Sequence, residues 1–455
     1  MSEFLFADDE LPAAPALAER SSRQEFAGTP RLRTPQRDQI EMHWRPLDEL
    51  LEPDHQARVV WDAVAGLDLS RWLREIRAVE GHVGRDATSP ALLVALWVYA
   101  TLDGVCIARE LERQCENHLA YQWLCGGVSV NYRLLAAFRS EHGERWDDLL
   151  TQIVAVLLAG DLVTMQRVAQ DGMKVRAHAG QSSFRSRGKL EQCLEQAREQ
   201  VEALKQQAEA EDQHALGEAK RAAQRRAAAD RQRRLEEAIR NCDQLQKQRE
   251  ESAKRSGRDV TKPRASITDP EARKMKFSDG GYRPGYNVQL STDVGSGVIV
   301  GVTVTNAGND LEQLPPMLEQ ISERYGAPPE EVLVDGGFAS RSSIEEATAL
   351  GATVYAPLKE EKKQLAAGKD PYAAKPKDTP ALTAWRARMK EAASKAMYRL
   401  RSQTAEWVNA IFRNRGMQQM PVRGQAKCQA VAVLYAITHN LLLGKKLRAK
   451  AAQSG

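Results

Sequence analysis

Residues 168–175 read Val-Ala-Gln-Asp-Gly-Met-Lys-Val, and residues 332–338 read Val-Leu-Val-Asp-Gly-Gly-Phe. In each stretch apolar residues lead to an aspartate, which is followed by glycine. We predict two strands that deliver Asp171 and Asp335 at their carboxyl ends, with Gly172 turning the chain beside the first acid. Open α/β sheets bind ligands beyond the carboxyl ends of their strands, so the two acids are predicted to share one site. Asp-Gly is also an ordinary turn sequence, and either acid alone has that simpler explanation.

The segments that follow alternate between strand and helix patterns. Two β-rich runs, 286–292 and 298–305, are joined by a loop with two glycines, which is typical of a hairpin. A further short strand is predicted over 353–357, and helical patterns cover 310–324, 343–350 and 383–413. Strands and helices interleaved in this way predict an α/β domain.

The N-terminal third of the chain has a different character. Residues 1–40 mix Pro, Ala, Ser and Arg without period, which predicts a flexible arm. The pattern then turns helical as far as residue 160, with helix starts at Ser89-Pro90 and near Asn131. We predict a helical N-terminal domain over 41–160, the α/β domain over 161–185 and 263–445, and a basic tail over 446–455.

A charged insert over residues 186–262 interrupts the α/β domain. It is rich in Ala, Glu, Gln, Lys and Arg, and Leu190, Ala197 and Leu204 recur at every seventh position. A second apolar stripe consists of Leu235, Ile239, Cys242 and Leu245. This pattern predicts a helical hairpin or coiled coil, and the simpler alternative is one long solvated helix.

Composition limits the possible functions. A chain of 455 residues is long enough for two or three domains, and a net charge of +4 permits nucleic-acid binding without requiring it. The six cysteines form no CxxC pair, so no zinc ribbon is indicated, and the chain lacks P-loop, HExxH and GxSxG motifs. The longest apolar runs are shorter than a membrane span requires. We therefore predict a cytoplasmic protein that contacts no membrane.

A third acid lies on the last predicted helix of the α/β domain. At about 100° per residue, Met397, Leu400, Trp407, Val408 and Ile411 share one side of this helix. Glu406 lies on the opposite arc with Tyr398, Ser402, Asn409 and Arg413. An ordinary solvated face has the same appearance, so the angular pattern leaves both interpretations open.

Motifs in a fixed order resemble the DDE transposases of bacterial insertion sequences. Tyr398-Arg399-Leu400-Arg401, Glu406 and Arg413 resemble the Tyr…Arg…Glu…Lys signature of that family, with arginine in place of the lysine. DGMKVRAHAG at 171–180, PGYNVQLSTD at 284–293 and VLVDGGFAS at 332–340 precede it in the same order. Asn409-Ala410 departs from the Phe-Gly pair that the family often has after the glutamate.

The resemblance implies an RNase H-like mixed sheet flanked by helices. Asp171, Asp335 and Glu406 would be the catalytic acids and would bind two Mg²⁺ ions, for which Mn²⁺ can substitute. If Asp335 were misplaced, Asp310 would replace it. The implied reaction is cleavage at the transposon ends followed by strand transfer into target DNA.

An enzyme of this class must also hold DNA, both its terminal inverted repeats and the target. Phosphate or base contacts are predicted for seven residues, each of which also has the simpler explanation of surface charge or packing: Arg133, Arg139, Lys174, Arg176, Tyr398, Arg401 and Arg413. Because two ends must be joined, a homodimer is the simplest assembly. The alternatives are a non-enzymatic DNA-binding or scaffolding protein, such as a domesticated transposase, and a plain nuclease without strand transfer.

Overall fold

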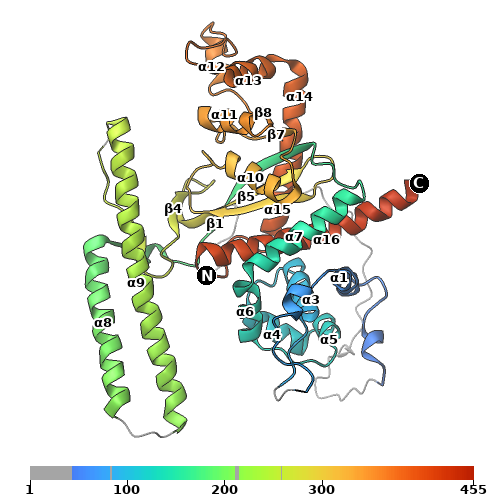
Figure 1. Cartoon of the computed structure of the whole chain (residues 1–455), viewed down its shortest axis with the longest axis vertical. Coiled ribbons are helices and arrows are strands. Elements are labelled where there is room, and N and C mark those ends of the chain that lie inside the picture. The colour runs from blue at the N-terminus through green and yellow to red at the C-terminus, as the bar shows by residue number, and fades with distance from the viewer. Residues whose placement is uncertain (1–43, 82–84, 211–214, 258, 455) are drawn as a thin grey trace, which may run out of the picture. The chain divides into compact units, whose positions relative to one another are not determined.

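The computed structural model describes residues 44–81, 85–210, 215–257 and 259–454, so the predicted arm lies outside the described residues. The elements discussed below belong to one compact unit, Leu47–Gly455. Its main sheet has the strand order β4–β5–β1–β7–β8 (Figure 1). β6 also pairs with β5, on the same edge as β4 but along a different stretch of the strand. The strands are β1 (Arg167–Arg176), β4 (Arg273–Lys276), β5 (Tyr282–Asp293), β6 (Ile299–Thr305), β7 (Glu331–Leu333) and β8 (Thr353–Tyr355).

The central strand β1 connects the two halves of the sheet. It pairs antiparallel with β5, from Val168 opposite Asp293 to Arg176 opposite Gly285. On its other edge it pairs parallel with β7, which is itself parallel to β8. The predicted hairpin is confirmed as β5–β6. This mixed sheet with helices packed on it is an RNase H-like α/β fold, as the resemblance implies.

Several helices of the α/β domain pack against strands of the sheet. α10 (Leu314–Tyr325) and α16 (Gln425–Ser454) contact β6, while α11 (Arg341–Ala349) contacts β8. The predicted helix over 383–413 consists of four elements, because the extended backbone of Glu391 interrupts it once and the helix beyond that point passes through a π-helical turn. They are α13 (Pro380–Lys390), α14 (Ala392–Arg401), the π-helical turn η3 (Ser402–Glu406) and α15 (Trp407–Asn414).

Two amide side chains of α16 cover the free edge of β6. The Asn440 side chain accepts from the Ile299 amide (2.9 Å) and donates to the Ile299 carbonyl (2.8 Å). Gln429 pairs in the same way with the Val304 amide (2.7 Å) and the Val302 carbonyl (2.9 Å). An unpaired strand edge is a site for unwanted association, so these contacts protect the sheet. α16 is long and apolar enough to cross a membrane, but 67% of its most apolar window is buried inside the protein.

The N-terminal helices form a bundle that continues the core of the sheet. α3 (Pro90–Leu102) begins at Ser89-Pro90 as predicted, and α6 (Tyr132–Glu141) is capped by Asn131, whose side chain accepts from the Leu134 amide. The other helices are α1 (Gln56–Ala65), α2 (Ser70–Leu73), α4 (Ala108–Asn117), α5 (Leu119–Cys125) and α7 (Gly143–Ala159). α16 contacts α3, α6 and α7, which joins the bundle to the α/β domain.

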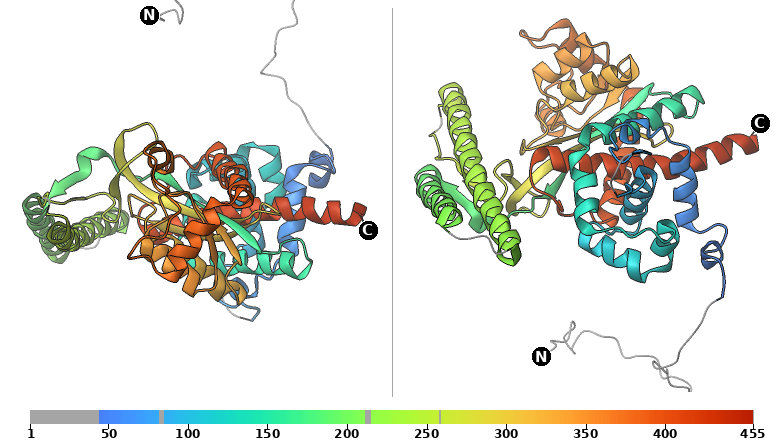
Figure 2. Two further views of the ribbon diagram at one scale, coloured as in Figure 1. Left: turned by 90° about the horizontal axis from the view of Figure 1, so that it is seen from above. Right: turned by 60° about the horizontal axis from the view of Figure 1, so that its bottom comes forward.

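The charged insert is a helical hairpin of α8 (Arg187–Ala210) and α9 (Ala215–Ser256). Figures 1 and 2 show the two helices side by side. Between them lies a small core that contains Leu190 and Ala197 from one predicted stripe, Leu235 and Cys242 from the other, and also Leu194 and Ala238. Packing between two helices is therefore confirmed, and the alternative of one solvated helix is wrong.

Candidate active site

Asp171 and Asp335 lie at the same level on neighbouring strands. Ala169 of β1 pairs with Leu333 of β7 in the parallel ladder. Two residues further on, β1 reaches Asp171 and the segment after β7 reaches Asp335. β7 ends at Leu333, and the Gly337 amide then donates to Asp335 Oδ1 at 2.7 Å. Asp335 therefore follows its strand as predicted. Asp171 lies in the middle of β1, so the prediction that its strand ends there is wrong.

Asp171 is held in an enclosed position by contacts from both sides. Its Oδ1 accepts from the Gly172 amide (3.0 Å), and its Oδ2 accepts from Asn409 Nδ2 (2.9 Å) and lies 3.6 Å from Arg401 Nη1. Burial raises the pKa of Asp171 to about 6, while Arg401 acts in the opposite direction. The negative charges of Asp335 and Asp310 also raise this pKa. Three carboxyl groups therefore lie close enough to repel one another.

Gly172 does not turn the chain as predicted. Its missing side chain lets neighbouring side chains come close to the strand. Gly172 continues the strand opposite Gln289. A Cβ at this position would collide with the Asp310 carboxylate and would lie 2.5 Å from Gln289 Nε2 and 2.9 Å from Asn287 Oδ1. These two amide side chains each donate to Asp310 Oδ1 at 2.7 Å. Only glycine leaves room for the Asp310 carboxylate to lie over the strand at this position.

Replacing Gly172 by Ala tests this close approach. Because the neighbouring side chains must move, we expect the free energy of unfolding to fall by about 1–3 kcal/mol, the usual cost of overpacking. Chemical denaturation measures it. Gly188→Ala is the matched control, since nothing lies within 4 Å of a Cβ built at Gly188. Equal stabilities of the two variants would contradict the steric role of Gly172.

Glu406 lies at the end of η3, which packs against β1 and β5, and its side chain is exposed. The structure does not bring its carboxylate into contact with Asp171 or Asp335. Its helix nevertheless faces the acids. The π-helical turn holds one extra residue, so Arg401 and Asn409 are two whole turns apart, and both reach Asp171 Oδ2. Glu406 precedes Asn409 by one turn.

The chemistry of the acids fits a divalent metal ion. Asp171 and Asp335 offer oxygen ligands, which hard cations such as Mg²⁺ prefer, and a cation would relieve the repulsion between them. The buried amide oxygens of Asn409 and Asn287 have no hydrogen-bond partner. Within residues 44–81, 85–210, 215–257 and 259–454, however, no three His, Cys, Asp or Glu side chains are close enough together to hold a metal ion. Among the described residues, neither Glu406 nor Asp310 completes a cluster of three with the two aspartates.

Three of the predicted DNA-contact residues line one pocket. Lys174, Arg176 and Arg413 line a pocket of about 350 Å³ together with Arg283, which sequence reasoning missed. Lys174 also lines a second cleft, of about 730 Å³, which contains Asp310 and the loop after Asp335. Lys174 is therefore shared by the two pockets.

The other predicted DNA contacts have different surroundings. Arg133 is exposed on α6, where its guanidinium carbon lies 5.8 Å from the centre of the Tyr132 ring. Tyr398 is half-buried and lies against Arg401. Burial acts to lower the pKa of Arg401, but the Tyr398 hydroxyl and then Asp171 outweigh it, and the pKa is raised. Arg401 therefore remains charged beside Asp171.

The structure corrects the prediction for Arg139. This side chain is only 4% exposed, donates to the Cys106 carbonyl at 2.6 Å and lies 4.2 Å from the centre of the Trp97 ring. Burial lowers its pKa to about 10. Arg139 sits in the core of the helical bundle and cannot reach a phosphate from this position.

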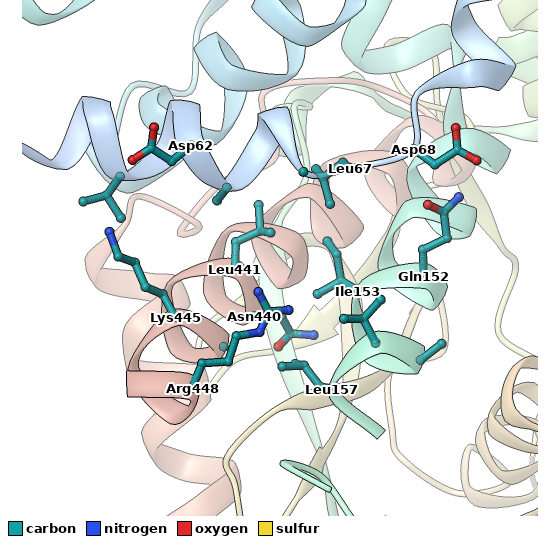
Figure 3. Close-up of a pocket in the computed structure, with 16 residues that line it drawn as sticks. Asp62, Leu67, Asp68, Gln152, Ile153, Leu157, Asn440, Leu441, Lys445 and Arg448 are labelled. Atoms are coloured by element: carbon teal, nitrogen blue, oxygen red, sulfur yellow. The ribbon is translucent and has the colours of Figure 1, made fainter. Parts of the chain in front are cut away.

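A further cavity of about 720 Å³ lies between α1, α7 and α16 (Figure 3). Leu67, Ile153, Leu157 and Leu441 give it apolar walls, and Lys445 and Arg448 lie at its edge. None of the predicted site residues lines it. This cavity is therefore separate from the site around Asp171 and Asp335.

Comparison with known families identifies the class of protein. Residues 252–441 match the Transposase DDE domain, and residues 45–141 match a transposase domain (DUF772). No curated protein and no solved structure matched the chain. The fold, the carboxylates at one level of the sheet and the two matches together define a transposase. The chain belongs to the insertion-sequence DDE transposases, a family that acts on DNA and generally uses divalent metal ions.

The match to the DDE domain covers two of the three predicted acids, Asp335 and Glu406. Asp171 precedes the matched residues, so its assignment depends on the strand pairing of β1 with β7. Sequence reasoning considered Asp310 only as a substitute and Asn409 only as a departure from the family. The spacing of apolar residues in the sequence gives no information about the hydrogen bonds that hold these two side chains in the site.

Proposed function

We propose that this transposase cleaves DNA at the ends of its insertion sequence and joins the freed 3′ ends to target DNA. The proposal depends mainly on the meeting of Asp171 and Asp335 at one level of the β1–β7 ladder, with Asp310 beside them. Burial raises the pKa of the Asp171 carboxyl group to about 6. A non-enzymatic scaffold has no need of a carboxylate buried in this way.

Asp171, Asp335 and Glu406 would hold two Mg²⁺ ions, and Mn²⁺ would substitute for them. Ions bound there would activate the attacking oxygen and stabilise the leaving oxygen of an in-line displacement at phosphorus. The chain itself orients Asp171 through Asn409 and supplies Arg401 as a fixed positive charge at 3.6 Å. Because Glu406 is exposed, we propose that it completes the site when DNA and metal bind.

The basic pocket next to the acids suits the DNA backbone. Lys174, Arg176 and Arg413 would contact phosphates close to the cut, and Arg133 would contact DNA from the helical N-terminal domain. We further propose a homodimer, since two transposon ends are joined, and a cytoplasmic location at the nucleoid.

The direct test of the function is a cleavage assay. The full-length protein is incubated with Mg²⁺ and a DNA duplex that carries one end of the element, and the products are separated by size. Our proposal expects a nick or break at the end of the element and, with added target DNA, a joined product. Binding without cleavage in either Mg²⁺ or Mn²⁺ would favour the scaffold.

The double variant Arg176→Ala with Arg413→Ala tests the basic pocket. Each phosphate contact contributes about 0.9 to the slope of log affinity against log salt concentration, so losing two contacts should reduce the slope by about 1.8. Fluorescence anisotropy at several salt concentrations measures this slope. Lys205→Ala, an exposed cation on α8, is the control and should leave the slope unchanged. An unchanged slope in the double variant would remove the pocket from the DNA path.

A further inference from the structure

Among the side chains around Asp171, Asn409 is both neutral and a hydrogen-bond donor. Among the described residues, it is the side chain that donates a hydrogen bond to this carboxylate, at 2.9 Å to Oδ2. The guanidinium of Arg401 is further away, at 3.6 Å, and the Gly172 amide holds the other oxygen. Asn409 is only 4% exposed, so no solvent competes for its amide.

A carboxylate in this position needs to be held in place. The negative charges of Asp335 and Asp310 act against its own charge, and Asn409 holds the oxygen that the Gly172 amide does not. A second cation at hydrogen-bond distance would also hold it, but would neutralise the charge that a metal ligand must offer. A neutral amide fixes the orientation and leaves that charge intact.

We infer that Asn409 is a positioning residue, which holds the Asp171 carboxylate in the orientation needed to bind a divalent cation. The inference rests on the proposed metal-dependent function and names a residue outside the three acids. The π-helical turn makes the contact possible, because it brings Asn409 and Arg401 onto the same side of the helix as Asp171. The unpartnered Asn409 Oδ1 remains beside the acids as a further oxygen.

Calorimetric titration of Mn²⁺ into the full-length protein tests this role without relying on activity. We expect Asn409→Ala to raise the Mn²⁺ dissociation constant by about 10–100-fold, the usual effect of losing a residue that orients a metal ligand. Half-maximal cleavage should likewise require more Mn²⁺, and the rate at saturating Mn²⁺ should be largely restored. Asn409→Leu removes the donor but fills the space, so it should show the same shift if the Ala variant unfolds. Asn414→Ala, exposed on the same helix, should bind Mn²⁺ as the wild type does.

Two results would overturn the inference, and they are distinguishable. If the wild type binds Mn²⁺, Asp171→Asn does not, and a folded Asn409 variant binds within twofold of the wild type, only the positioning role fails. If the wild type and Asp171→Asn give the same titration, the proposed metal site fails and the role of Asn409 fails with it. Circular dichroism in EDTA establishes that each variant is folded.

Discussion

We expect cleavage of end-bearing DNA to fall by at least about a thousandfold when Asp171 is replaced by Asn, as is usual for the loss of a central catalytic group. Asn keeps the shape of the side chain but loses the charge that a metal ion needs. DNA binding should persist, because Lys174 and Arg413 are unaltered. Gel assays of cleavage and binding on the same preparation separate the two effects. Undiminished cutting would remove Asp171 from the catalytic site.

The same variant should be more stable than the wild type when metal is absent. Burial raises the pKa of Asp171 from 3.8 to about 6, so the native state favours the protonated form. The stability that this proton contributes is complete below pH 3.8 and is lost as the pH rises through about 6. At pH 8 the buried charge costs about 3 kcal/mol, and Asn removes that cost. Denaturation in EDTA at pH 8 measures the gain, which should shrink below pH 5.

Asp68→Asn is the matched control for this stability effect. The Ser70 amide lowers the pKa of the exposed Asp68 carboxylate, so its replacement should bring no gain at pH 8. If Asp68→Asn and Asp171→Asn shift the melting temperature equally, the burial argument for Asp171 is wrong.

Glu406→Gln gives the second large effect and has a different signature. Cleavage should again fall by at least about a thousandfold in Mg²⁺ and in Mn²⁺. The free energy of unfolding should change by less than about 0.5 kcal/mol, because the side chain is exposed and touches neither aspartate. Loss of activity without a change in stability would mark Glu406 as a residue kept for catalysis.

Glu391→Gln, at the start of the same helical region, is the control for Glu406. It should cleave DNA at the wild-type rate. Strand transfer retained in Glu406→Gln would mean that the third acid is another residue, and Asp310 is then the next to replace, since it already lies beside Asp171.

The spacing of apolar residues predicted which helices and strands form better than it predicted where each of them begins and ends. The hairpin β5–β6, the helix start at Ser89-Pro90 and the packed insert depend on apolar spacing and capping, which are local properties of the sequence. The end of β1 was predicted wrongly, because Asp171-Gly172 resembles a turn. Gly172 instead makes room for Asp310, a residue more than a hundred positions away, which lies where a side chain at position 172 would be.

The candidate site shows the same limit. A regular helical wheel places Asn409 and Glu406 on a solvated arc, whereas the π-helical turn shifts the helix so that Asn409 is buried against Asp171. Arg139 was predicted to contact DNA, but the Trp97 ring and the Cys106 carbonyl enclose it. These contacts come from other elements, and no pattern within one helix encodes them.

A crystal of the protein bound to transposon-end DNA and soaked in Mn²⁺ tests the central claim most directly. Anomalous scattering locates the manganese independently of the protein atoms. We expect Mn²⁺ bound to carboxylate oxygens of Asp171 and Asp335, with Glu406 turned inward to the same site. Manganese bound elsewhere, or held without Asp171, would contradict the account.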